Sequence, residues 1–488
     1  MTDFLLYFLI CELMLLILWG FWKPSRVYQY PFLAGCVFAL WAWPQFYRLH
    51  KSGAVPDPIL DKALVMTILC SAMCYLGYQK GNRPIRKLNW AFNRERLTQA
   101  AFVLTLIGVT FQYKLSQIPE EVKGTQASGL PVLYVFLSHL FVFGFALSAI
   151  LTVRRFSWGA FGIACLGILG YLETILFLGR REGAIQFALT IGMFLWFIRR
   201  KLPPRPVILC GIVVGAFVSY NIATYREAMS HSSLFKAGSG AKVSELKQMN
   251  VVTEEGTEMR NAAYYLAATE TLYAFDLGVS HWSAFVWYFF PAHIFGLTAK
   301  ENLMTLGGIL HIGANAQIAY GYQNATGSTV GGITDAFASF WYFGCLEFFA
   351  IGYIMRRLYV SAVGGMFVWQ LACSLITVFS LLAITHSTHV MLLCWVPVTA
   401  FLGSSLVYAR AKPGEAKSET IPAVAGSREP RPVAGVAEAS KGRRAWLVLR
   451  NPKGRLNLVP RRGRPAPGRP TPNERTPSRG AIPGRKTV

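Results

Sequence analysis

Over the first 410 residues, long apolar stretches alternate with shorter polar connections. The stretches are continuously apolar and do not alternate apolar with polar residues, so they indicate helices and not the strands of a membrane barrel. Several reach the ~20 residues that a helix needs to cross the apolar core of a bilayer. The sequence therefore predicts an all-α, polytopic membrane bundle with about eleven spans, within a range of about ten to thirteen. The spans are expected at 4–22, 31–47, 59–78, 98–113, 130–152, 156–178, 183–198, 206–224, 336–355, 365–384 and 389–409.

The charge of the connections distinguishes the two sides of the membrane. Segment 79–97 contains six Lys or Arg residues and one Glu. Basic clusters on the same side stand at 154–155, 199–205, 356–357 and beyond 410. Short cytoplasmic loops carry an excess of Lys and Arg, so we expect these connections in the cytoplasm, with the N-terminus periplasmic and the C-terminus cytoplasmic. The opposite side holds 114–129, 179–182 and 225–335, and also the basic loop 48–58, which is the exception to the rule.

These spans divide the chain into four parts. They are 1–224 with spans one to eight, 225–335 as a large extracytoplasmic loop, 336–410 with spans nine to eleven, and 411–488 as a cytoplasmic tail. Within the loop, 259–277 is expected to be an amphipathic helix. The aromatic segment 281–297 is expected to be re-entrant or to lie at the membrane interface, and a twelfth span is the alternative. The first stretch contains Glu12 and lacks a basic leader, so it is expected to be a retained span and not a signal peptide.

Much of the net charge of +24 comes from the tail. From Arg410 onward there are 19 Lys or Arg residues against five Asp or Glu, in a segment rich in Pro, Gly and Ala. Such a composition is typical of disorder, and contact with anionic lipid headgroups is the alternative. Most of the remaining excess lies in short loops, so the charge does not indicate a nucleic-acid partner.

An arginine pair, Arg180 and Arg181, lies in a Gly-Arg-Arg-Glu-Gly turn on the side expected to be periplasmic. The pair runs against the positive-inside bias and therefore indicates a role beyond topology. Guanidinium groups bind phosphate oxygens in a bidentate manner and stay charged when partly desolvated. Arg226 and Glu227 follow the eighth span on the same side, so they are candidates for the same anion site. The alternatives are exposed surface pairs, or a salt bridge within the turn to Glu182.

The late loop and the last outer turn offer further polar candidates. His293 and Lys300 follow a Phe-Phe-Pro-Ala segment and could supply a base and an anion contact, although an interfacial His is often only an amphipathic residue. A Gly- and Thr-rich run leads to Asp335, which could bind a sugar or a pyrophosphate, or cap the ninth span. In the turn His-Ser-Thr-His, either His386 or His389 could act as an acid–base group or hydrogen-bond donor.

The sequence predicts no metal site and no cofactor. His386 and His389 stand three residues apart, but no Cys or carboxylate accompanies them. All nine cysteines lie in apolar stretches, which indicates neither a disulfide framework nor a metal site. The chain lacks a Walker A motif, a dinucleotide-binding loop, a His-Glu-x-x-His motif and a serine nucleophile elbow. Its cytoplasmic loops are too short for a nucleotide-binding domain, so a substrate that is already energised and already in the membrane is expected.

With these motifs the chain resembles the Wzy-type O-antigen and exopolysaccharide polymerases, the oligosaccharide repeat-unit polymerases of bacteria. The resemblance covers residues 1–410. It rests on the number of spans, the dominant late loop, the Gly-Arg-Arg-Glu-Gly turn, the aromatic–Pro segment before Lys300, and the Gly- and Thr-rich entry into the span at 335–344. It implies a metal-independent glycosyltransferase of the bacterial inner membrane. A growing glycan on undecaprenyl pyrophosphate would be moved onto an incoming lipid-linked repeat unit at the periplasmic face.

The implied activity assigns roles to the candidates. A cationic site must bind the pyrophosphate and glycan, and its candidates are Arg180, Arg181, Arg226, Lys300 and His386. A base must accept the proton of the acceptor hydroxyl, and its candidates are His293, Asp335 and Glu227. The implied partners are the lipid-linked donor and acceptor, membrane lipids, and a chain-length regulator and flippase of the same pathway. The alternatives are an O-antigen ligase, which differs in its acceptor, a transporter or flippase for lipid-linked glycans, and a structural assembly component.

Overall fold

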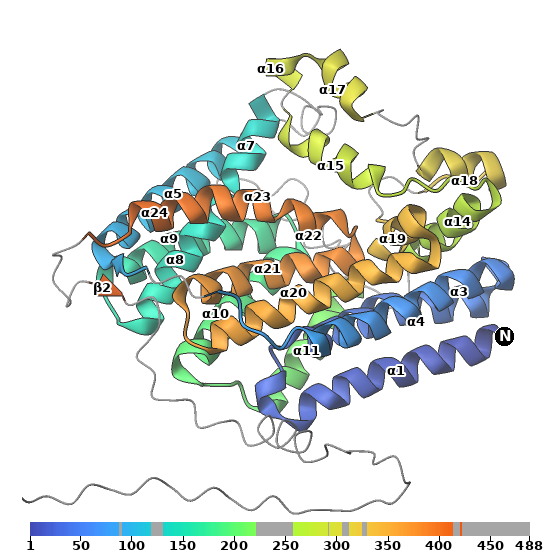
Figure 1. Ribbon diagram of the computed structural model, residues 1–488, viewed down its shortest axis with the longest axis horizontal. Coiled ribbons are helices and arrows are strands. Elements are labelled where there is room, and N and C mark those ends of the chain that lie inside the picture. The colour runs from blue at the N-terminus through green and yellow to red at the C-terminus, as the bar shows by residue number, and fades with distance from the viewer. Residues whose placement is uncertain are drawn as a thin grey trace, which may run out of the picture. The chain divides into compact units, whose positions relative to one another are not determined.

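The computed structural model describes residues 1–86, 90–118, 130–220, 257–290, 292–304, 312–324, 329–412 and 420–421. These residues are mostly helical (Figure 1). They include one small antiparallel sheet, in which β1 (Phe92–Asn93) pairs with β2 (Thr420–Ile421). The expectation of an all-α membrane bundle is therefore confirmed in its coarse form.

Helices occupy each of the eleven apolar stretches. In chain order they are α1 (Thr2–Trp22); α2 (Tyr30–Val37) with η2 (Phe38–Ala42) and α3 (Trp43–Ser52); α4 (Asp57–Lys80); α5 (Arg94–Ser116); α7 (Leu130–Ser138) with α8 (Leu140–Arg154); α9 (Trp158–Leu172) with η3 (Glu173–Phe177); α10 (Arg181–Arg199); α11 (Arg205–Tyr220); α19 (Gly332–Phe340) with η4 (Trp341–Gly344) and α20 (Cys345–Val363); α21 (Phe367–Thr385); and α22 (His389–Leu393) with α23 (Trp395–Pro397), η5 (Val398–Gly403) and α24 (Ser404–Tyr408).

Seven helical segments among the described residues are long and apolar enough to cross a membrane. They are Thr2–Trp22, Asp57–Lys80, Leu133–Arg154, Trp158–Phe177, Gly332–Val363, Phe367–Thr385 and His389–Tyr408. The other four expected spans correspond to α2–α3, α5, α10 and α11. That these four also cross the membrane stays a prediction.

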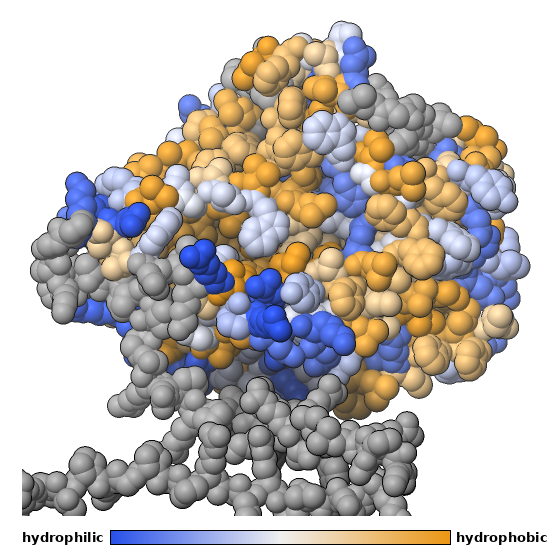
Figure 2. Space-filling view, viewed as in Figure 1, coloured by the Kyte–Doolittle hydropathy of each residue, from blue (hydrophilic) through white to orange (hydrophobic). Residues whose placement is uncertain are grey.

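Helix α1 is apolar on all sides. Its inward-facing residues include Leu6, Leu9, Leu13 and Leu16, and its exposed residues include Phe4, Tyr7, Leu15 and Leu18. A helix that is hydrophobic all round suits a lipid environment, because in water the outer row would cost about 25 cal/mol for each Å² of exposed apolar surface. Hydrophobic side chains also cover much of the face seen in Figure 2. The bundle is therefore suited to being embedded in a membrane.

Glycines allow a close helix crossing between α4 and α20. A Cβ atom on Gly77 would lie 2.0 Å from the carbonyl oxygen of Phe349, and one on Gly352 would lie 2.4 Å from that of Cys74. Lipid-embedded helices associate through such close backbone packing, since apolar burial drives them together less than it does in water. The α4–α20 pair is thus a rigid support for the residues that follow α19.

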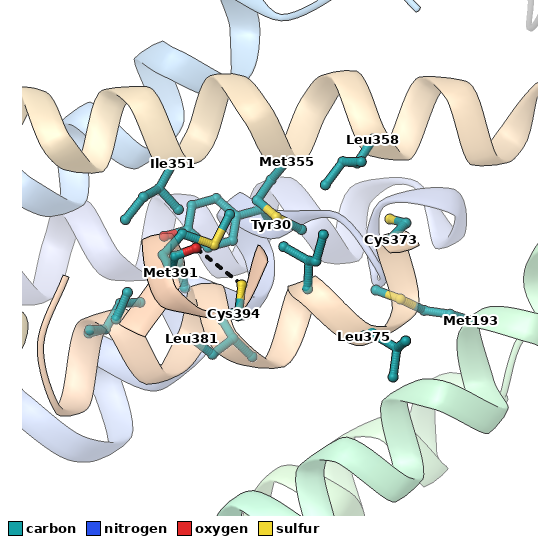
Figure 3. Packing of buried hydrophobic residues seen from close by; sticks show 14 of the residues in the cluster. Tyr30, Met193, Ile351, Met355, Leu358, Cys373, Leu375, Leu381, Met391 and Cys394 are labelled. Carbon is teal, nitrogen blue, oxygen red and sulfur yellow. Dashed lines mark hydrogen bonds between the residues drawn. The ribbon is translucent and has the colours of Figure 1, made fainter. Parts of the chain in front are cut away.

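The centre of the bundle is packed with aromatic, aliphatic and sulfur-containing residues. Tyr30 is almost completely buried, and its hydroxyl lies 3.4 Å from Cys74 Sγ and donates to the carbonyl of Ser380 at 3.5 Å. Figure 3 shows Met355 and Met391 beside its ring. All nine cysteines are free thiols. The five buried ones act as small apolar packing residues.

Five helices are described from the expected extracytoplasmic loop. They are α14 (Thr257–Thr271), α15 (Val279–Phe289), α16 (Ala292–Phe295), α17 (Leu297–Met304) and α18 (Ile312–Tyr320). The amphipathic helix expected over 259–277 is shorter than predicted, since α14 ends at Thr271. Tyr273 and Leu277 have φ angles of 52° and 51°, and this left-handed conformation does not continue a helix.

Segment 281–297 is divided between α15, α16 and the start of α17. The longest of these, α15, has 11 residues and a length of about 17 Å, which is roughly half of a bilayer core. The described residues therefore do not support a twelfth span here, and short helices fit the re-entrant or interfacial alternative.

Most of the described arginines gather at one end of the bundle, here called the basic end. It is formed by η1 (Pro24–Arg26) and residues 81–86, 90–94, 154–157, 199–205, 356–366 and 409–412. Their side chains donate to neutral oxygen atoms of neighbouring segments: Arg26 to Trp19, Arg199 to Val153, Arg200 to Val363, Arg154 to Gln370 and Arg356 to Asn82. The opposite end, here called the loop end, is the end at which α14, α18 and α19 lie (Figure 1).

Candidate functional site

Five residues from four segments form a polar cluster at the loop end. The histidine–carboxylate cluster consists of His281 of α15, Asp335 of α19, Glu347 of α20, and Thr388 and His389 at the start of α22. His281 Nε2 lies 3.4 Å from Glu347 Oε2, 3.8 Å from Asp335 Oδ2 and 3.0 Å from Thr388 Oγ1. One imidazole nitrogen therefore faces three oxygen atoms that come from three different helices.

A break between α19 and α20 brings the two carboxylates together. Asp335 and Glu347 are 12 residues apart and would be about 18 Å apart along an unbroken helix. At Trp341 the backbone turns with φ 55° and ψ −142°, and the chain then folds back closely on itself. A Cβ atom on Gly344 would lie 1.9 Å from the carbonyl oxygen of Ala336, so the fold-back requires glycine. Broken helices of this kind place polar groups inside membrane proteins at functional sites.

Asp276 holds α15 in place beside this break. Its carboxylate accepts hydrogen bonds from the backbone N–H groups of Gly278 at 2.8 Å and Ser280 at 3.3 Å, which satisfies donors at the start of α15. Its own N–H donates to the carbonyl of Ala338 in α19 at 2.9 Å. Helix α15 is thereby fixed to α19, and His281 is held against Asp335.

Asp335 is only 5% exposed and binds the turn between α21 and α22. Its Oδ2 accepts from the Thr388 backbone N–H at 3.0 Å and from the Thr388 hydroxyl at 2.5 Å. It makes no capping hydrogen bond to its own helix, where Gly331 is the N-cap residue. The alternative in which Asp335 caps the ninth span is therefore wrong. The carboxylate instead joins the two polar segments at this end of the bundle.

His389 lies between Asp335 and a serine hydroxyl. Its Nδ1 is 3.7 Å from Asp335 Oδ2, and its Nε2 is 2.9 Å from Ser387 Oγ. The ring meets that of His281 edge-on, with 6.3 Å between the ring centres. A carboxylate at one ring nitrogen and a hydroxyl at the other is the arrangement that lets an imidazole accept a proton from the hydroxyl side.

The charges of the cluster act strongly on His281. Burial alone lowers the pKa of this imidazole, but the Glu347, Asp335 and Asp276 carboxylates outweigh burial and raise the pKa above its usual value. Within the described part of the chain, neither carboxylate oxygen of Glu347 has a hydrogen-bond partner, and the same holds for His389 Nδ1. Buried polar atoms without hydrogen-bond partners are uncommon in native structures, and a functional role is one explanation for them.

Arg181 belongs to a second group of residues, here called the Glu258 junction. Glu258 of α14 accepts hydrogen bonds from the Trp41 indole N–H, from the Gln45 amide at 3.1 Å and from the Thr329 hydroxyl at 3.1 Å. Arg181 Nη2 lies 3.9 Å from Glu258 Oε1, which is an ion pair beyond hydrogen-bond distance. About a third of the Arg181 side chain is exposed, so its guanidinium keeps access to solvent.

The Glu258 junction and the histidine–carboxylate cluster are joined by the segment 329–335. Thr329 binds Glu258 at one end of this segment, and Asp335 belongs to the cluster at the other. Between them the backbone is closely packed, because a Cβ atom on Gly331 would lie 2.8 Å from the Trp41 ring. The described end of the Gly- and Thr-rich run that the sequence singled out thus connects the Glu258 junction to the histidine–carboxylate cluster.

Arg180 takes a different direction from its neighbour. Its Nη1 lies 3.6 Å from Glu182 Oε1. This ion pair is the salt bridge within the turn that the sequence analysis gave as an alternative. It lines a cavity of about 60 Å³ between α5, α8, η3 and α10. The polar lining of the cavity includes Gln112, Ser138, His139, Thr174, Glu182 and Gln186. This volume admits a few water molecules and no sugar ring, so a ligand would reach Arg180 from its exposed side.

Lys300 and His386 are the other predicted site residues whose side chains the structure describes, and both have contacts outside the cluster. Lys300 Nζ donates to the carbonyl of Trp287 at 2.8 Å and lies 4.7 Å from the centre of its ring, and burial lowers its pKa. His386 is exposed, with Nδ1 2.8 Å from the Thr385 hydroxyl. His293 lies on α16, but its side chain is outside the described part of the chain, and Arg226 and Glu227 also lie outside the described residues.

The sequence analysis did not identify His281, Glu347 or Glu258 as site residues. Glu347 carried a usable signal, because an acidic residue within an apolar span is rare and marks a polar site. His281 and Glu258 carried no such signal in their local sequence.

No family model, no curated protein and no solved structure matches this chain.

Proposed function

We propose that the protein is a membrane glycosyltransferase that polymerises undecaprenyl-pyrophosphate-linked oligosaccharide repeat units at the periplasmic face of the bacterial inner membrane. The observation that carries this proposal is the segment 329–335, which connects the partly exposed cation Arg181, through Glu258, to the acid–base pair Asp335 and His389. Glycosyl transfer from a lipid pyrophosphate needs both groups, one for the leaving pyrophosphate and one for the acceptor hydroxyl.

The orientation follows from the two ends of the bundle. The basic end carries the clustered arginines and is expected to face the cytoplasm by the positive-inside rule. The loop end, with the histidine–carboxylate cluster, then faces the periplasm. A substrate that is already energised and already in the membrane suits this side, because no nucleotide is needed there.

In the proposed reaction, an oxygen of the acceptor glycan forms a bond to the anomeric carbon of the donor sugar. The bond between that carbon and the pyrophosphate oxygen breaks, and undecaprenyl pyrophosphate leaves with the electron pair. His389 Nε2 accepts the hydroxyl proton, from the position at which the Ser387 hydroxyl lies 2.9 Å away. Asp335 stabilises the imidazolium that forms, and its 3.7 Å distance to Nδ1 shortens as the charge develops.

Arg181 is proposed to bind the pyrophosphate. Its ion pair with Glu258 is 3.9 Å long, and phosphate oxygens can replace it with shorter bidentate hydrogen bonds. Arg180, with nearly half of its side chain exposed, is proposed to add a second contact from the other side of the turn.

Product analysis with purified full-length protein and a defined lipid-linked repeat unit tests the proposal. We expect glycans of two or more repeat units on the lipid, and their loss in the H389Q variant. Transfer only to a lipid A–core acceptor would identify a ligase instead. Movement of the substrate across vesicles without bond formation would identify a flippase, and either result would overturn the polymerase assignment.

A further inference from the structure

The histidine–carboxylate cluster also has the donor set of a metal site. His281, Asp335 and Glu347 each offer one ligand atom, and the three atoms lie within 4.8 Å of one another. Ligands that are about 2.1 Å from a common ion stand roughly 3.0–3.5 Å apart, by the geometry of tetrahedral and octahedral sites. The distances of 3.4 Å and 3.8 Å from His281 Nε2 to the two carboxylates need only small side-chain shifts to meet this requirement.

A second observation points to a cation. Both Glu347 oxygens are buried, and among the described residues they meet His281 Nε2, 3.4 Å from Oε2, without forming a hydrogen bond. A buried carboxylate that accepts no hydrogen bond is costly, and a metal ion bound together with His281 would satisfy it. Two carboxylates and the neutral imidazole of His281 carry a charge of −2, which a divalent ion balances.

We infer that His281, Asp335 and Glu347 bind one divalent transition-metal ion, such as Mn²⁺ or Zn²⁺. An imidazole nitrogen with two carboxylate oxygens suits these ions, whereas Ca²⁺ and Mg²⁺ prefer sites made of oxygen alone. The ion joins α15, α19 and α20 across the helix break. Thr388, which donates to Asp335 Oδ2, and His389, which lies 3.7 Å from the same oxygen, orient that carboxylate.

This inference goes beyond the proposed function and does not depend on it, because metal binding needs no glycan. It also departs from the metal-independent transfer that the sequence resemblance implies. The polymerase assignment is tested by lipid-linked products, so the failure of one proposal leaves the other open to its own test.

The experiment uses purified full-length protein in detergent, stripped with EDTA and titrated with MnCl2 while free Mn²⁺ is followed by electron paramagnetic resonance. We expect one bound Mn²⁺ per chain, displaced by ZnCl2, and an affinity at least about tenfold lower in E347Q and D335N. Mn²⁺ should raise the unfolding temperature of the wild type and leave that of E347Q unchanged. Size-exclusion elution and an unfolding transition in EDTA show whether each variant is folded.

The matched control is His50, which also stands between two carboxylates. Its Nε2 lies 3.2 Å from Asp3 and its Nδ1 lies 3.0 Å from Asp57, but both acidic side chains are largely exposed. H50A should bind Mn²⁺ as the wild type does. Absence of stoichiometric Mn²⁺ in the wild type would overturn the inference. So would binding that E347Q and D335N retain, or binding that only H50A loses.

Discussion

The arginines at the two ends of the bundle have different partners. At the basic end, Arg356 Nε donates to the Asn82 amide oxygen at 2.9 Å, and Arg200 donates to the Val363 carbonyl at 2.8 Å. At the loop end, Arg180 and Arg181 face carboxylates at 3.6 Å and 3.9 Å, beyond hydrogen-bond distance. The first set holds helix ends together through short bonds to neutral oxygens, whereas the second set is held loosely by charge.

The magnitudes separate the two roles. A hydrogen bond from a charged group contributes about 1.5–3 kcal/mol to stability. A partly exposed ion pair contributes about 0–1 kcal/mol. Releasing Arg181 from Glu258 therefore costs little, and an incoming phosphate can replace Glu258. The basic end is suited to holding structure and the loop end to exchanging partners.

The largest effect is expected from the residue that accepts the proton. H389Q should lower the rate of polymer formation by about 10²–10⁴-fold, because glutamine fills the space but cannot act as a base. The measurement is the rate of lipid-linked product formation by purified protein. H50Q, a change of the same kind at a histidine outside the cluster, should keep near wild-type activity. Equal losses in both variants would place the base elsewhere.

The next effect is expected at the loop-end arginine. R181A should lower the rate by about 10²-fold, as for the loss of a group that stabilises charge in the transition state. The R181K variant should regain part of the lost rate, because lysine restores the positive charge but cannot bind phosphate in a bidentate manner. If R356A at the basic end loses as much activity as R181A while remaining folded, the functional difference between the two ends does not exist.

A smaller effect is expected from neutralising Glu258. E258Q keeps the shape of the side chain but removes the charge that competes with phosphate for Arg181. The KM for the lipid-linked donor should fall by about two- to fivefold with little change in kcat, which corresponds to an ion pair of up to about 1 kcal/mol. A higher KM would mean that Glu258 positions Arg181 for the substrate and does not compete with it.

The smallest effect on activity is expected at the basic end. R356A removes the hydrogen bond to Asn82 and the contact with the Tyr78 ring, whose centre is 5.0 Å away. Unfolding should be easier by about 1.5–3 kcal/mol, while activity measured well below the unfolding temperature stays close to the wild type. Thermal unfolding in detergent measures the first quantity. An unchanged unfolding temperature would show that the short bonds at this end do not stabilise the fold.

The sequence predicted the helices well because their signal is local. Continuous apolar stretches identify each one without knowledge of its neighbours. The same holds for Asp335 and Arg181, which stand out as charges at the ends of apolar stretches. The local sequence could not show toward which partner the Arg180 side chain points. Arg180 is the extended N-cap residue of α10 and Arg181 is its first helical residue, so two adjacent guanidinium groups diverge toward different partners.

The cluster around His281 depends on contacts that no local pattern contains. Its two carboxylates meet because the chain breaks at Trp341, a residue that rarely adopts a positive φ. A helix prediction would continue through this position and separate Asp335 from Glu347. The imidazole arrives from α15, more than 50 residues earlier in the chain. Only the folded backbone places these groups within reach of one another.

The small sheet at the basic end fastens residues 420–421 to the start of α5. Strand β2 pairs with β1, and the Ala411 N–H donates to the carbonyl of Ala91 at 2.9 Å, so Ala411 and β2 are both fastened beside the start of α5. A reporter or affinity tag joined after Ile421 preserves this fastening, whereas one joined at 410 removes a strand. Designs for topology mapping should therefore place the junction beyond the strand pair.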